Sequence, residues 1–267
     1  LWLKKLGSKV KGYSLEPNTN PSLFKVLKLE KSISSEVGDI RNLDNLLKSM
    51  QEFEPDIVLH MAAQPLVLDS YKDPIKTYNT NVIGTVNLFE AVRNTSSIKA
   101  VVNITSDKCY QNNEWERGYH ESDPMGGYDP YSNSKGCSEL ITSSYRNSFF
   151  NSSSNVSLAS VRAGNVIGGG DWAKDRIIPD ILKAFDNKEP VIIRNPNAVR
   201  PWQHVLEPIS GYLTVAEKLY TFGDKYAQGW NFGPKDKDAR PVRELLDYLV
   251  SHWKEESSWI QDSKENP

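Results

Sequence analysis

Two short motifs carry side chains that could act together in a redox reaction. Thr105-Ser106-Asp107-Lys108 follows an apolar run over 100–104, and Tyr131-Ser132-Asn133-Ser134-Lys135 comes later in the chain. The apolar run is typical of a buried parallel strand, and ligands of open α/β sheets bind just beyond the carboxyl ends of such strands. Tyr131 and Lys135 are four residues apart, so they share one face of a helix. An ammonium beside a phenol favours the phenolate, which would make Tyr131 a base near neutral pH.

The spacing of Tyr131 and Lys135 does not establish a site by itself. A surface helix with an unrelated tyrosine and lysine has the same spacing, so the interpretation depends on the elements around the two motifs. Those elements must bring the end of the strand over 100–104 next to the helix that carries Tyr131.

Composition excludes several classes of partner. The chain has 32 basic and 34 acidic side chains, so no overall field favours nucleic acid or an anionic membrane. No apolar run reaches membrane-spanning length and no signal peptide is visible. Cys109 and Cys137 indicate neither a disulfide framework nor a zinc site. We therefore expect a cytoplasmic protein that has no metal site and binds neither nucleic acid nor a membrane.

Strand patterns alternate with amphipathic helical patterns along most of the chain. The patterns predict strands over 10–15, 37–40, 56–60, 100–104 and 156–161. They predict helices over 43–53 and 74–94, and a further helix that carries Tyr131 and Lys135. This alternation indicates the α/β class, a doubly wound parallel sheet of Rossmann type with right-handed crossovers.

The pattern becomes less regular beyond Arg162. It predicts a helix over 178–187 and a strand over 191–194 in a smaller irregular lobe packed over the carboxyl end of the sheet. It also predicts a helix over 210–220, whose well-formed apolar side indicates that it returns to the main domain. At the other end, residues 1–6 followed by Gly7 have the pattern of a helix end and its cap. We therefore expect the chain to be a piece of a longer protein.

Further segments, in order along nearly the whole chain, carry a family resemblance. The chain resembles the extended short-chain dehydrogenases/reductases and, within that superfamily, the CDP-glucose 4,6-dehydratases. Besides the two motifs above, the matching segments are Gly12-Tyr13-Ser14-Leu15, Gly38-Asp39-Ile40-Arg41, His60-Met61-Ala62-Ala63-Gln64-Pro65, Tyr78-Asn79-Thr80-Asn81-Val82-Ile83-Gly84-Thr85, Arg162-Ala163-Gly164-Asn165-Val166-Ile167-Gly168-Gly169-Gly170-Asp171-Trp172 and Arg200-Pro201-Trp202-Gln203-His204-Val205.

The resemblance implies bound NAD. Asp39 and Ile40 would meet the adenine, the small Ala62 and Ala63 would let the backbone approach the cofactor, and Gln64 would lie near the active centre. Asn81 lowers helix propensity, so we expect its amide to brace the helix or the neighbouring site. The full set of cofactor contacts expected is Asp39, Ile40, Ala62, Ala63, Gln64, Asn81, Tyr131 and Lys135.

The resemblance also implies two domains and a dimer. Residues 1–163 would form the NAD-binding domain, without its first strand and glycine-rich loop. Residues 164–267 would form mainly the substrate-binding lobe, with 203–222 returning to the first domain and the carboxyl end truncated. A homodimer would form through the helices around 74–94 and 131–145.

The implied reaction begins with oxidation at C4 of the sugar. Tyr131 would take the C4 hydroxyl proton, Lys135 would favour the phenolate and hold the nicotinamide ribose, and Ser106 would hydrogen-bond the C4 oxygen. The resulting ketone makes the C5 proton acidic, so water can leave across C5 and C6. Asp107 is the expected acid at the C6 oxygen.

Lys108 is the expected base at C5, at a position where the related dTDP-glucose enzymes carry glutamate. It must be neutral when it acts, which desolvation or a nearby positive charge would favour. A salt-bridged loop pair of Asp107 and Lys108 is the alternative interpretation of these two residues.

Substrate contacts are implied for Asn165, Arg176, Arg194, Arg200 and His204. A nucleotide diphosphate requires donors and positive charge, and the planar guanidinium suits phosphate oxygens. Two other functions remain open. One is a dehydratase or epimerase of another nucleotide sugar, although epimerases need no acid and base for eliminating water. The other is a catalytically silent remnant that binds NAD or a nucleotide sugar.

Overall fold

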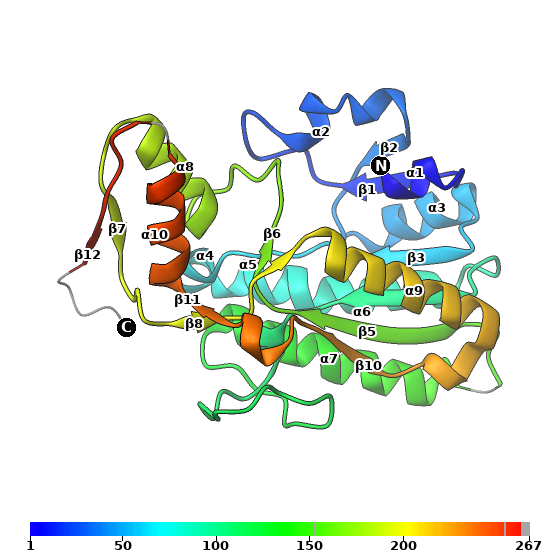
Figure 1. The fold of residues 1–267 in the computed structure, drawn as a ribbon. Coiled ribbons are helices and arrows are strands. Elements are labelled where there is room, and N and C mark those ends of the chain that lie inside the picture. Colours follow the sequence, from blue (N-terminus) through cyan, green and yellow to red (C-terminus); the bar gives the residue numbers. More distant parts are fainter. Residues whose placement is uncertain (152, 254, 263–267) are drawn as a thin grey trace. The chain divides into compact units, whose positions relative to one another are not determined.

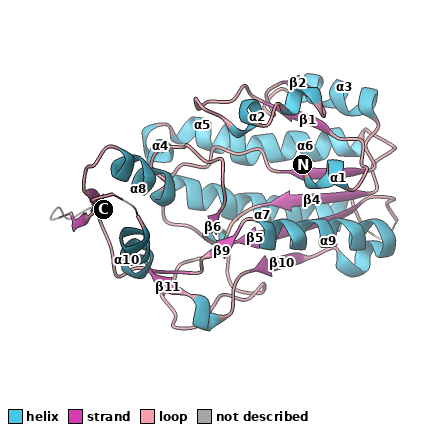
Figure 2. Ribbon diagram, turned by 45° about the horizontal axis from the view of Figure 1, so that its top comes forward, coloured by secondary structure: helices cyan, strands magenta, loops and turns pink. Residues whose placement is uncertain are grey.

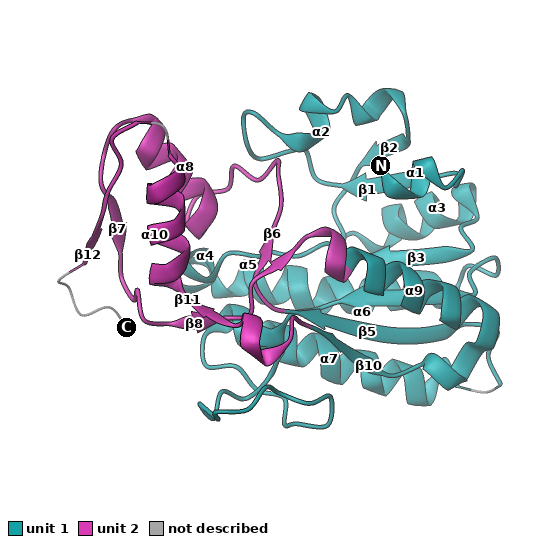
Figure 3. Cartoon of the chain, viewed as in Figure 1, with its two compact units in different colours: residues 1–163, 209–232 teal, residues 164–208, 233–267 magenta. Residues whose placement is uncertain are grey.

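A computed structural model describes residues 1–151, 153–253 and 255–262, and the chain divides into two compact units (Figure 3). Unit 1 comprises Leu1–Ala163 and Ile209–Phe232, and unit 2 comprises Gly164–Pro208 and Gly233–Pro267. The segment that returns to the first unit is therefore Ile209–Phe232 rather than 203–222, because it ends in a strand of the main sheet. Within the lobe expected over 164–267, residues 254 and 263–267 lie outside the described residues.

A parallel sheet of four strands forms the centre of unit 1, in the order β10-β5-β4-β3. The strands are β3 (Ile57–His60), β4 (Ala100–Ile104), β5 (Ser157–Ala163) and β10 (Gly229–Phe232). His60 is the register partner of Asn103, and Ile104 that of Val161. Because the strands are parallel, the segments that follow β3, β4 and β5 all begin at the same edge of the sheet.

A second parallel pair in unit 1 joins β1 (Lys11–Ser14) to β2 (Ser34–Val37). The strand expected over 37–40 is thus displaced toward the amino terminus. The strand instead includes the polar residues 34–36, because these pair with β1, and the apolar pattern did not indicate them. Asp39 and Ile40 lie in the turn that follows.

Helices cover both faces of the central sheet (Figures 1 and 2). Val101 and Leu158 pack in a cluster with residues of α3 (Leu43–Phe53), α6 (Gly84–Arg93) and α7 (Pro130–Ser148). The adjacent strand residues Val102 and Ala159 belong to a different cluster, with α9 (Leu206–Phe222). Alternate residues of a strand point to opposite faces, so helices on both sides bury the two sets. The expected doubly wound α/β fold is confirmed.

The helix expected over 74–94 is interrupted. It consists of α5 (Pro74–Tyr78), a π-helical turn η2 (Asn79–Ile83) and α6. Helix α4 (Val67–Lys72), which the sequence patterns did not predict, precedes it. A π-helical turn admits an extra residue per turn, and here it contains the buried Asn81, whose amide is used outside the helix.

Unit 2 is built on α8 (Ile177–Asp186), β7 (Val191–Ile193), α10 (Val242–His252) and β12 (Trp259–Gln261). Its core includes Ile181, Phe185 and Leu246. Short pairs join β6 (Val166–Ile167) to β9 (Gln203–His204) and β8 (Val199–Arg200) to β11 (Arg240–Pro241). The remaining elements of the chain are α1 (Trp2–Lys5), α2 (Leu23–Val26), η1 (Leu29–Lys31), η3 (Asp107–Cys109), η4 (Gly223–Tyr226) and η5 (Asp236–Asp238).

Among the helices of the described ranges, none combines the length and the apolar character needed to cross a membrane. The same residues contain no group of three or more His, Cys, Asp or Glu side chains placed to hold a metal ion.

Candidate active site

The segment after β4 turns sharply and places three of the expected site residues in sequence. Ser106 caps the short helix η3: its Oγ accepts a hydrogen bond from the Lys108 N–H (3.2 Å) and donates one to Asp107 Oδ1 (3.0 Å). Asp107 is half-buried, whereas Lys108 is exposed and Cys109 takes the buried position of the turn. The desolvation expected for Lys108 is therefore not found in this structure.

Helix α7 places Tyr131 in its first turn and Lys135 one turn later. Asp129 caps the helix by accepting the Ser132 N–H (3.0 Å), and Pro130 occupies the first position. The Tyr131 N–H, which has no partner within the helix, donates to Ser70 Oγ of α4 (3.1 Å). Tyr131 is half-buried and Lys135 is buried, so the helix turns the face that carries both residues at least partly inward.

Gly136 allows the two motifs to approach each other. A Cβ atom at this position would lie 2.5 Å from the Gly126 carbonyl oxygen and 3.2 Å from that of Cys109. These backbone atoms leave no room for a side chain, so glycine lets η3 pack directly on α7. Ser106, Asp107 and Lys108 are thereby held against the helix that carries Tyr131 and Lys135.

Burial weakens the affinity of Lys135 for its proton. Its Nζ donates to the Ile104 carbonyl oxygen at 3.5 Å. Burial lowers the pKa of Lys135 to about 8, although Glu139 and Cys109 act in the opposite direction. His60 is affected similarly: burial, and next the charge of Lys135, lower its pKa to about 3. A neutral His60 therefore lies in the same buried region as Lys135.

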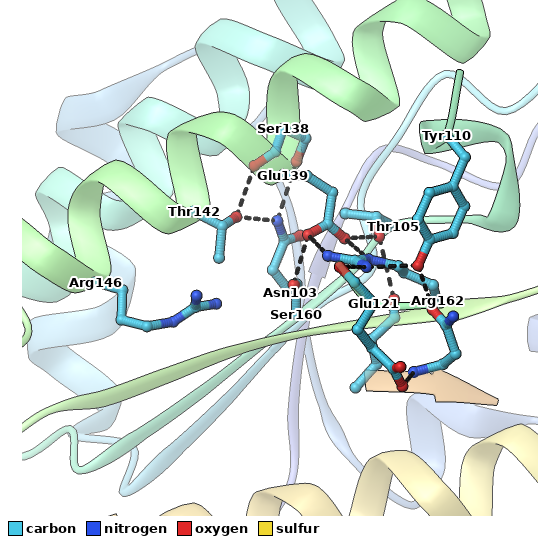
Figure 4. A network of polar contacts seen from close by, with 12 residues as sticks. Asn103, Thr105, Tyr110, Glu121, Ser138, Glu139, Thr142, Arg146, Ser160 and Arg162 are labelled. Atoms are coloured by element: carbon cyan, nitrogen blue, oxygen red, sulfur yellow. Dashed lines mark hydrogen bonds and ion pairs between the residues drawn. The ribbon is translucent and has the colours of Figure 1, made fainter. Parts of the chain in front are cut away.

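A buried ion pair that the sequence analysis did not identify joins β5 to α7 (Figure 4). Arg162 of β5 donates from Nε to Glu139 Oε1 (2.9 Å) and from Nη2 to Glu139 Oε2 (2.7 Å). Thr105 and Ser160 also donate to the Glu139 carboxylate. Burial opposes ionisation of Glu139, but these hydrogen bonds and the charge of Arg162 hold its pKa below the usual value.

Hydrogen bonds also connect this ion pair to the segment that follows η3. Arg162 Nη1 donates to the Tyr110 hydroxyl (2.6 Å), which in turn donates to Asn231 Oδ1 of β10 (2.7 Å). Glu121 contributes its carbonyl oxygen to Arg162 (3.2 Å) and its carboxylate to the Asn231 N–H (2.8 Å). These contacts tie residues 110–121 to the edge of the central sheet (Figure 4).

Gln64 and Asn81 brace the loop after β3. Asn81 Oδ1 accepts the Gln64 N–H (2.7 Å), and its Nδ2 donates to the Gln64 carbonyl (3.1 Å) and to Ser134 Oγ (2.9 Å). The Gln64 side chain bonds both backbone groups of Leu66 and the hydroxyl of Thr77. Both amides hold the loop against α5 and α7, and their contact with a cofactor stays a prediction.

The expected adenine residues differ from each other in accessibility. Asp39 is half-buried after β2, and its carboxylate binds the Arg41 guanidinium through Nη2 at 2.5 Å. Ile40 is buried in the core against Gly84, so its side chain is not available to adenine, and only a backbone contact stays possible as a prediction. Ala62 and Ala63 follow β3 and are half-buried, as close backbone approach requires.

The expected substrate residues all belong to unit 2. The β6–β9 pair brings Asn165 near His204, because the Asn165 carbonyl accepts the Gln203 N–H (3.0 Å) and Ile167 is the register partner of His204. His204 Nδ1 accepts the Leu206 N–H (3.3 Å), so this nitrogen is already engaged by the backbone.

The three arginines of that set fall into two places. Arg176 precedes α8, where its carbonyl accepts the Asp180 N–H (2.9 Å), and the charge of Arg194 also acts on Asp180. Arg200 lies on β8 directly opposite Arg240 of β11. Like charges on opposed strand positions repel each other, and Glu244 offsets part of this repulsion by pairing with Arg240 at 3.4 Å.

Comparison with known proteins identifies the family. A family model described as GDP-mannose 4,6 dehydratase matches residues 5–229. The chain belongs to this dehydratase family. It is 59% identical over 271 residues to a CDP-glucose 4,6-dehydratase of Salmonella typhimurium, and the match covers 100% of this chain and 76% of that protein. It is also 26% identical over 206 residues to a dTDP-D-glucose 4,6-dehydratase of Dictyostelium discoideum, covering 73% of this chain and 46% of the relative.

Solved structures share the fold of this dehydratase family member. MoeE5 in complex with UDP-glucuronic acid and NAD superposes with a TM-score of 0.80 at 21% identity, covering 98% of this chain and 80% of its own. The dTDP-glucose 4,6-dehydratase of Bacillus anthracis in complex with NAD gives 0.76 at 20% identity, with coverage of 98% and 79%. These likenesses establish the Rossmann-like architecture.

The sequence contained two signals for the unanticipated ion pair of this dehydratase. Glu139 follows Lys135 by four residues and therefore shares its inward face. Arg162 is a charged residue in the apolar strand pattern 156–161 and its continuation. A charge at a position predicted to be buried requires a partner of opposite charge, which indicates such a pair without identifying its members.

Proposed function

We propose that the chain is an NAD-dependent 4,6-dehydratase that converts CDP-glucose to CDP-4-keto-6-deoxyglucose. The observation that carries the proposal is the packing of Ser106-Asp107-Lys108 against the helix of Tyr131 and Lys135. The 59% identity to a CDP-glucose 4,6-dehydratase supports the choice of nucleotide. The overall reaction releases one water molecule and involves no net oxidation of the sugar.

The residues at the edge of the sheet fit a bound dinucleotide. The Lys135 ammonium has three N–H groups and a single long hydrogen bond among the described residues, so it retains donors for a ribose. The half-buried Ala62 and Ala63 leave room for close approach of a ligand to the backbone. When bound, NAD would accept a hydride from C4 and return it to C6. Lys135 and Tyr131 would hold its ribose, and Asp39 its adenine end.

Tyr131 and Lys135 would control the proton at the C4 hydroxyl. The Tyr131 phenolate takes this proton as C4 is oxidised, and the nearby Lys135 ammonium stabilises the phenolate. Ser106 Oγ hydrogen-bonds the C4 oxygen in place of its present contact with Asp107. The proton on Tyr131 does not return to the C4 oxygen, because C4 remains a ketone in the product.

Asp107 and Lys108 would carry out the loss of water. Lys108, as a free amine, takes the C5 proton, the C5–C6 double bond forms, and Asp107 gives a proton to the departing C6 oxygen. Lys108 would return its proton to C5 as the hydride reaches C6, and the proton taken by Tyr131 would replace the one lost from Asp107. Because Lys108 is exposed in this structure, we propose that the substrate itself supplies the desolvation that favours the neutral amine. Asn165, Arg176, Arg194, Arg200 and His204 are the proposed nucleotide contacts.

Incubation of the protein with a panel of nucleotide sugars tests the proposal. CDP-glucose should yield a 4-keto-6-deoxy product without added reductant, whereas UDP-, dTDP- and GDP-linked sugars should react much more slowly. Preferred turnover of another nucleotide sugar would contradict the substrate assignment. Retention of NAD with no turnover of any of them would favour a silent binding protein.

We also propose a homodimer through the outer faces of α4, α5, η2 and α7. Large apolar side chains are exposed on these elements: Tyr71 (54%), Ile75 (73%), Ile83 (48%) and Leu140 (60%). Replacement of Ile75 and Leu140 by glutamate should convert the dimer to a monomer in sedimentation experiments. Leu15→Glu, at a residue that is 60% exposed after β1, should leave the association state unchanged. A monomeric unmodified protein would contradict the proposal.

A further inference from the structure

The ion pair of Glu139 and Arg162 holds both ends of the segment that carries the proposed acid and base. Thr105, immediately before Ser106, donates to Glu139. Tyr110, immediately after η3, accepts a hydrogen bond from Arg162 (2.6 Å). Glu139 belongs to α7, one turn beyond Lys135, and Arg162 belongs to β5. One buried pair thus connects the segment 106–109, helix α7 and the central sheet (Figure 4).

We propose that Glu139 and Arg162 are positioning residues, which fix Ser106, Asp107 and Lys108 relative to Tyr131 and Lys135. This inference rests on the proposed function, because it gives these five residues their roles. Four hydrogen bonds fix the orientation of the Glu139 carboxylate. They come from Thr105, which follows β4, and from Ser160 and Arg162 of β5. A displaced segment would separate the acid and base from the oxidised carbon, which can lower a rate on the order of 10²-fold.

The Glu139 carboxylate also raises the pKa of Lys135 and so opposes the lowering caused by burial. The charged and titratable groups around the Lys135 ammonium come from each element packed on it. They are Glu139 from α7, Cys109 from the η3 segment, His60 from β3 and, through Glu139, Arg162 from β5. Glu139 favours the protonated lysine, and its ion pair with Arg162 places a compensating positive charge beside the carboxylate.

This arrangement distinguishes positioning from a purely structural role. Glu139→Gln and Arg162→Gln break the same ion pair. If the pair has only a structural role, both variants should change the pKa of Lys135 in the same way. If its charges act on Lys135, the two variants should shift that pKa in opposite directions. Glu139→Gln removes the anion and leaves an unpaired cation, which disfavours a charged Lys135, whereas Arg162→Gln leaves an unpaired anion, which favours it.

Nuclear magnetic resonance of lysine labelled with ¹³C at Cε measures the titration of Lys135 without requiring turnover. The Lys135 signal is assigned by its absence in Lys135→Met. We expect the midpoint to fall by about one pH unit in Glu139→Gln and to rise by about one unit in Arg162→Gln. Shifts in the same direction, or no shift, would overturn the electrostatic part of the proposal whether or not the protein has dehydratase activity.

Tyr110→Phe and Thr105→Val test the positioning part with all charges retained. Each removes one link between the ion pair and the segment 106–109. Both should lower kcat on the order of tenfold or more, with KM and the Lys135 titration nearly unchanged, because the segment moves while Lys135 keeps its neighbours. Unchanged kcat in both variants would overturn this part, and these variants also serve if the charge variants fail to fold.

Glu90→Gln is the matched control. Glu90 of α6 accepts the Tyr145 hydroxyl (2.7 Å) and the Arg93 guanidinium (2.8 Å), so it also attaches α7 to its neighbour, but far along the helix from Lys135. The control should change neither the Lys135 titration nor kcat. If it lowers kcat as strongly as Tyr110→Phe and Thr105→Val do, general loosening of α7 explains the loss and the proposal fails. Absence of turnover in the unmodified protein would instead contradict the proposed function.

Discussion

Arg162 Nη2 lies 2.7 Å from Glu139 Oε2, and the two side chains are only 6% and 4% exposed. Replacing a buried ion pair by apolar residues is often neutral for stability, so its presence alone is weak evidence for a stabilising role. Here the pair binds Thr105 and Tyr110 on either side of Ser106, Asp107 and Lys108. Its position links the ends of β4 and β5 to the helix of Tyr131 and Lys135, and this link is the basis of the positioning role proposed above.

Lys108→Met should block the loss of water while leaving oxidation at C4 intact. The variant lacks a base for the C5 proton, so the protein should accumulate reduced nicotinamide, visible by its absorbance, and should not exchange the C5 hydrogen with deuterated water. Lys48→Met, at an exposed side chain of α3, is the control and should turn over normally. Unchanged product formation by Lys108→Met would exclude Lys108 as the base.

Lys135→Met should stabilise the fold while removing activity. The pKa of Lys135 falls from 10.5 to about 8 on burial, so the folded protein binds this proton more weakly than the unfolded chain. The cost is fully present below pH 8 and disappears as the pH rises toward 10.5. We expect a gain on the order of 3 kcal/mol in the free energy of unfolding at pH 7, measured with denaturant. The gain should shrink between pH 8 and 10.5, and Lys48→Met should show neither effect.

His60 should make the protein sensitive to acid. Its pKa is lowered from 6.5 to about 3 by burial and by Lys135. Between these pH values the unfolded chain therefore binds a proton at His60 that the folded protein does not bind. Stability is lost as the pH falls from 6.5 toward 3, by about 2 kcal/mol at pH 5. His60→Gln, which can still bond Thr85, should flatten this dependence, whereas replacement of the exposed His252 by glutamine should not. Equal acid sensitivity of the two variants would contradict the prediction.

Asn81→Ala should destabilise the loop after β3. The substitution leaves the Gln64 N–H without its acceptor at 2.7 Å and removes the donor to Ser134, so we expect a loss of about 2–3 kcal/mol in denaturant unfolding. Asn87→Ala, which removes two hydrogen bonds at the half-buried surface of α6, should cost less. A larger loss for Asn87→Ala would show that the Asn81 amide is not the main support of this loop.

Local patterns predicted several elements closely. Helix α3 (Leu43–Phe53) and strand β4 (Ala100–Ile104) have the expected bounds, because an amphipathic period after the Asn42 cap and an unbroken apolar run depend on neighbouring residues only. Strand β2 was displaced and the helix over 74–94 was interrupted. In both cases a partner elsewhere in the fold, β1 or the Gln64 backbone, overrides the local pattern.

The sequence by itself determined the alternation of strands and helices, the two motifs and the family to which they belong. Only the tertiary structure showed that Lys108 is exposed, that Ile40 is buried in the core, and that Glu139 and Arg162 contact Thr105 and Tyr110 at the two ends of the segment 106–109. Helical and strand periods arise from contacts within a few residues, so they can be read along the chain. The strength of a buried ion pair depends on desolvation and on partners from distant segments, which exist only once the sheet and α7 have packed.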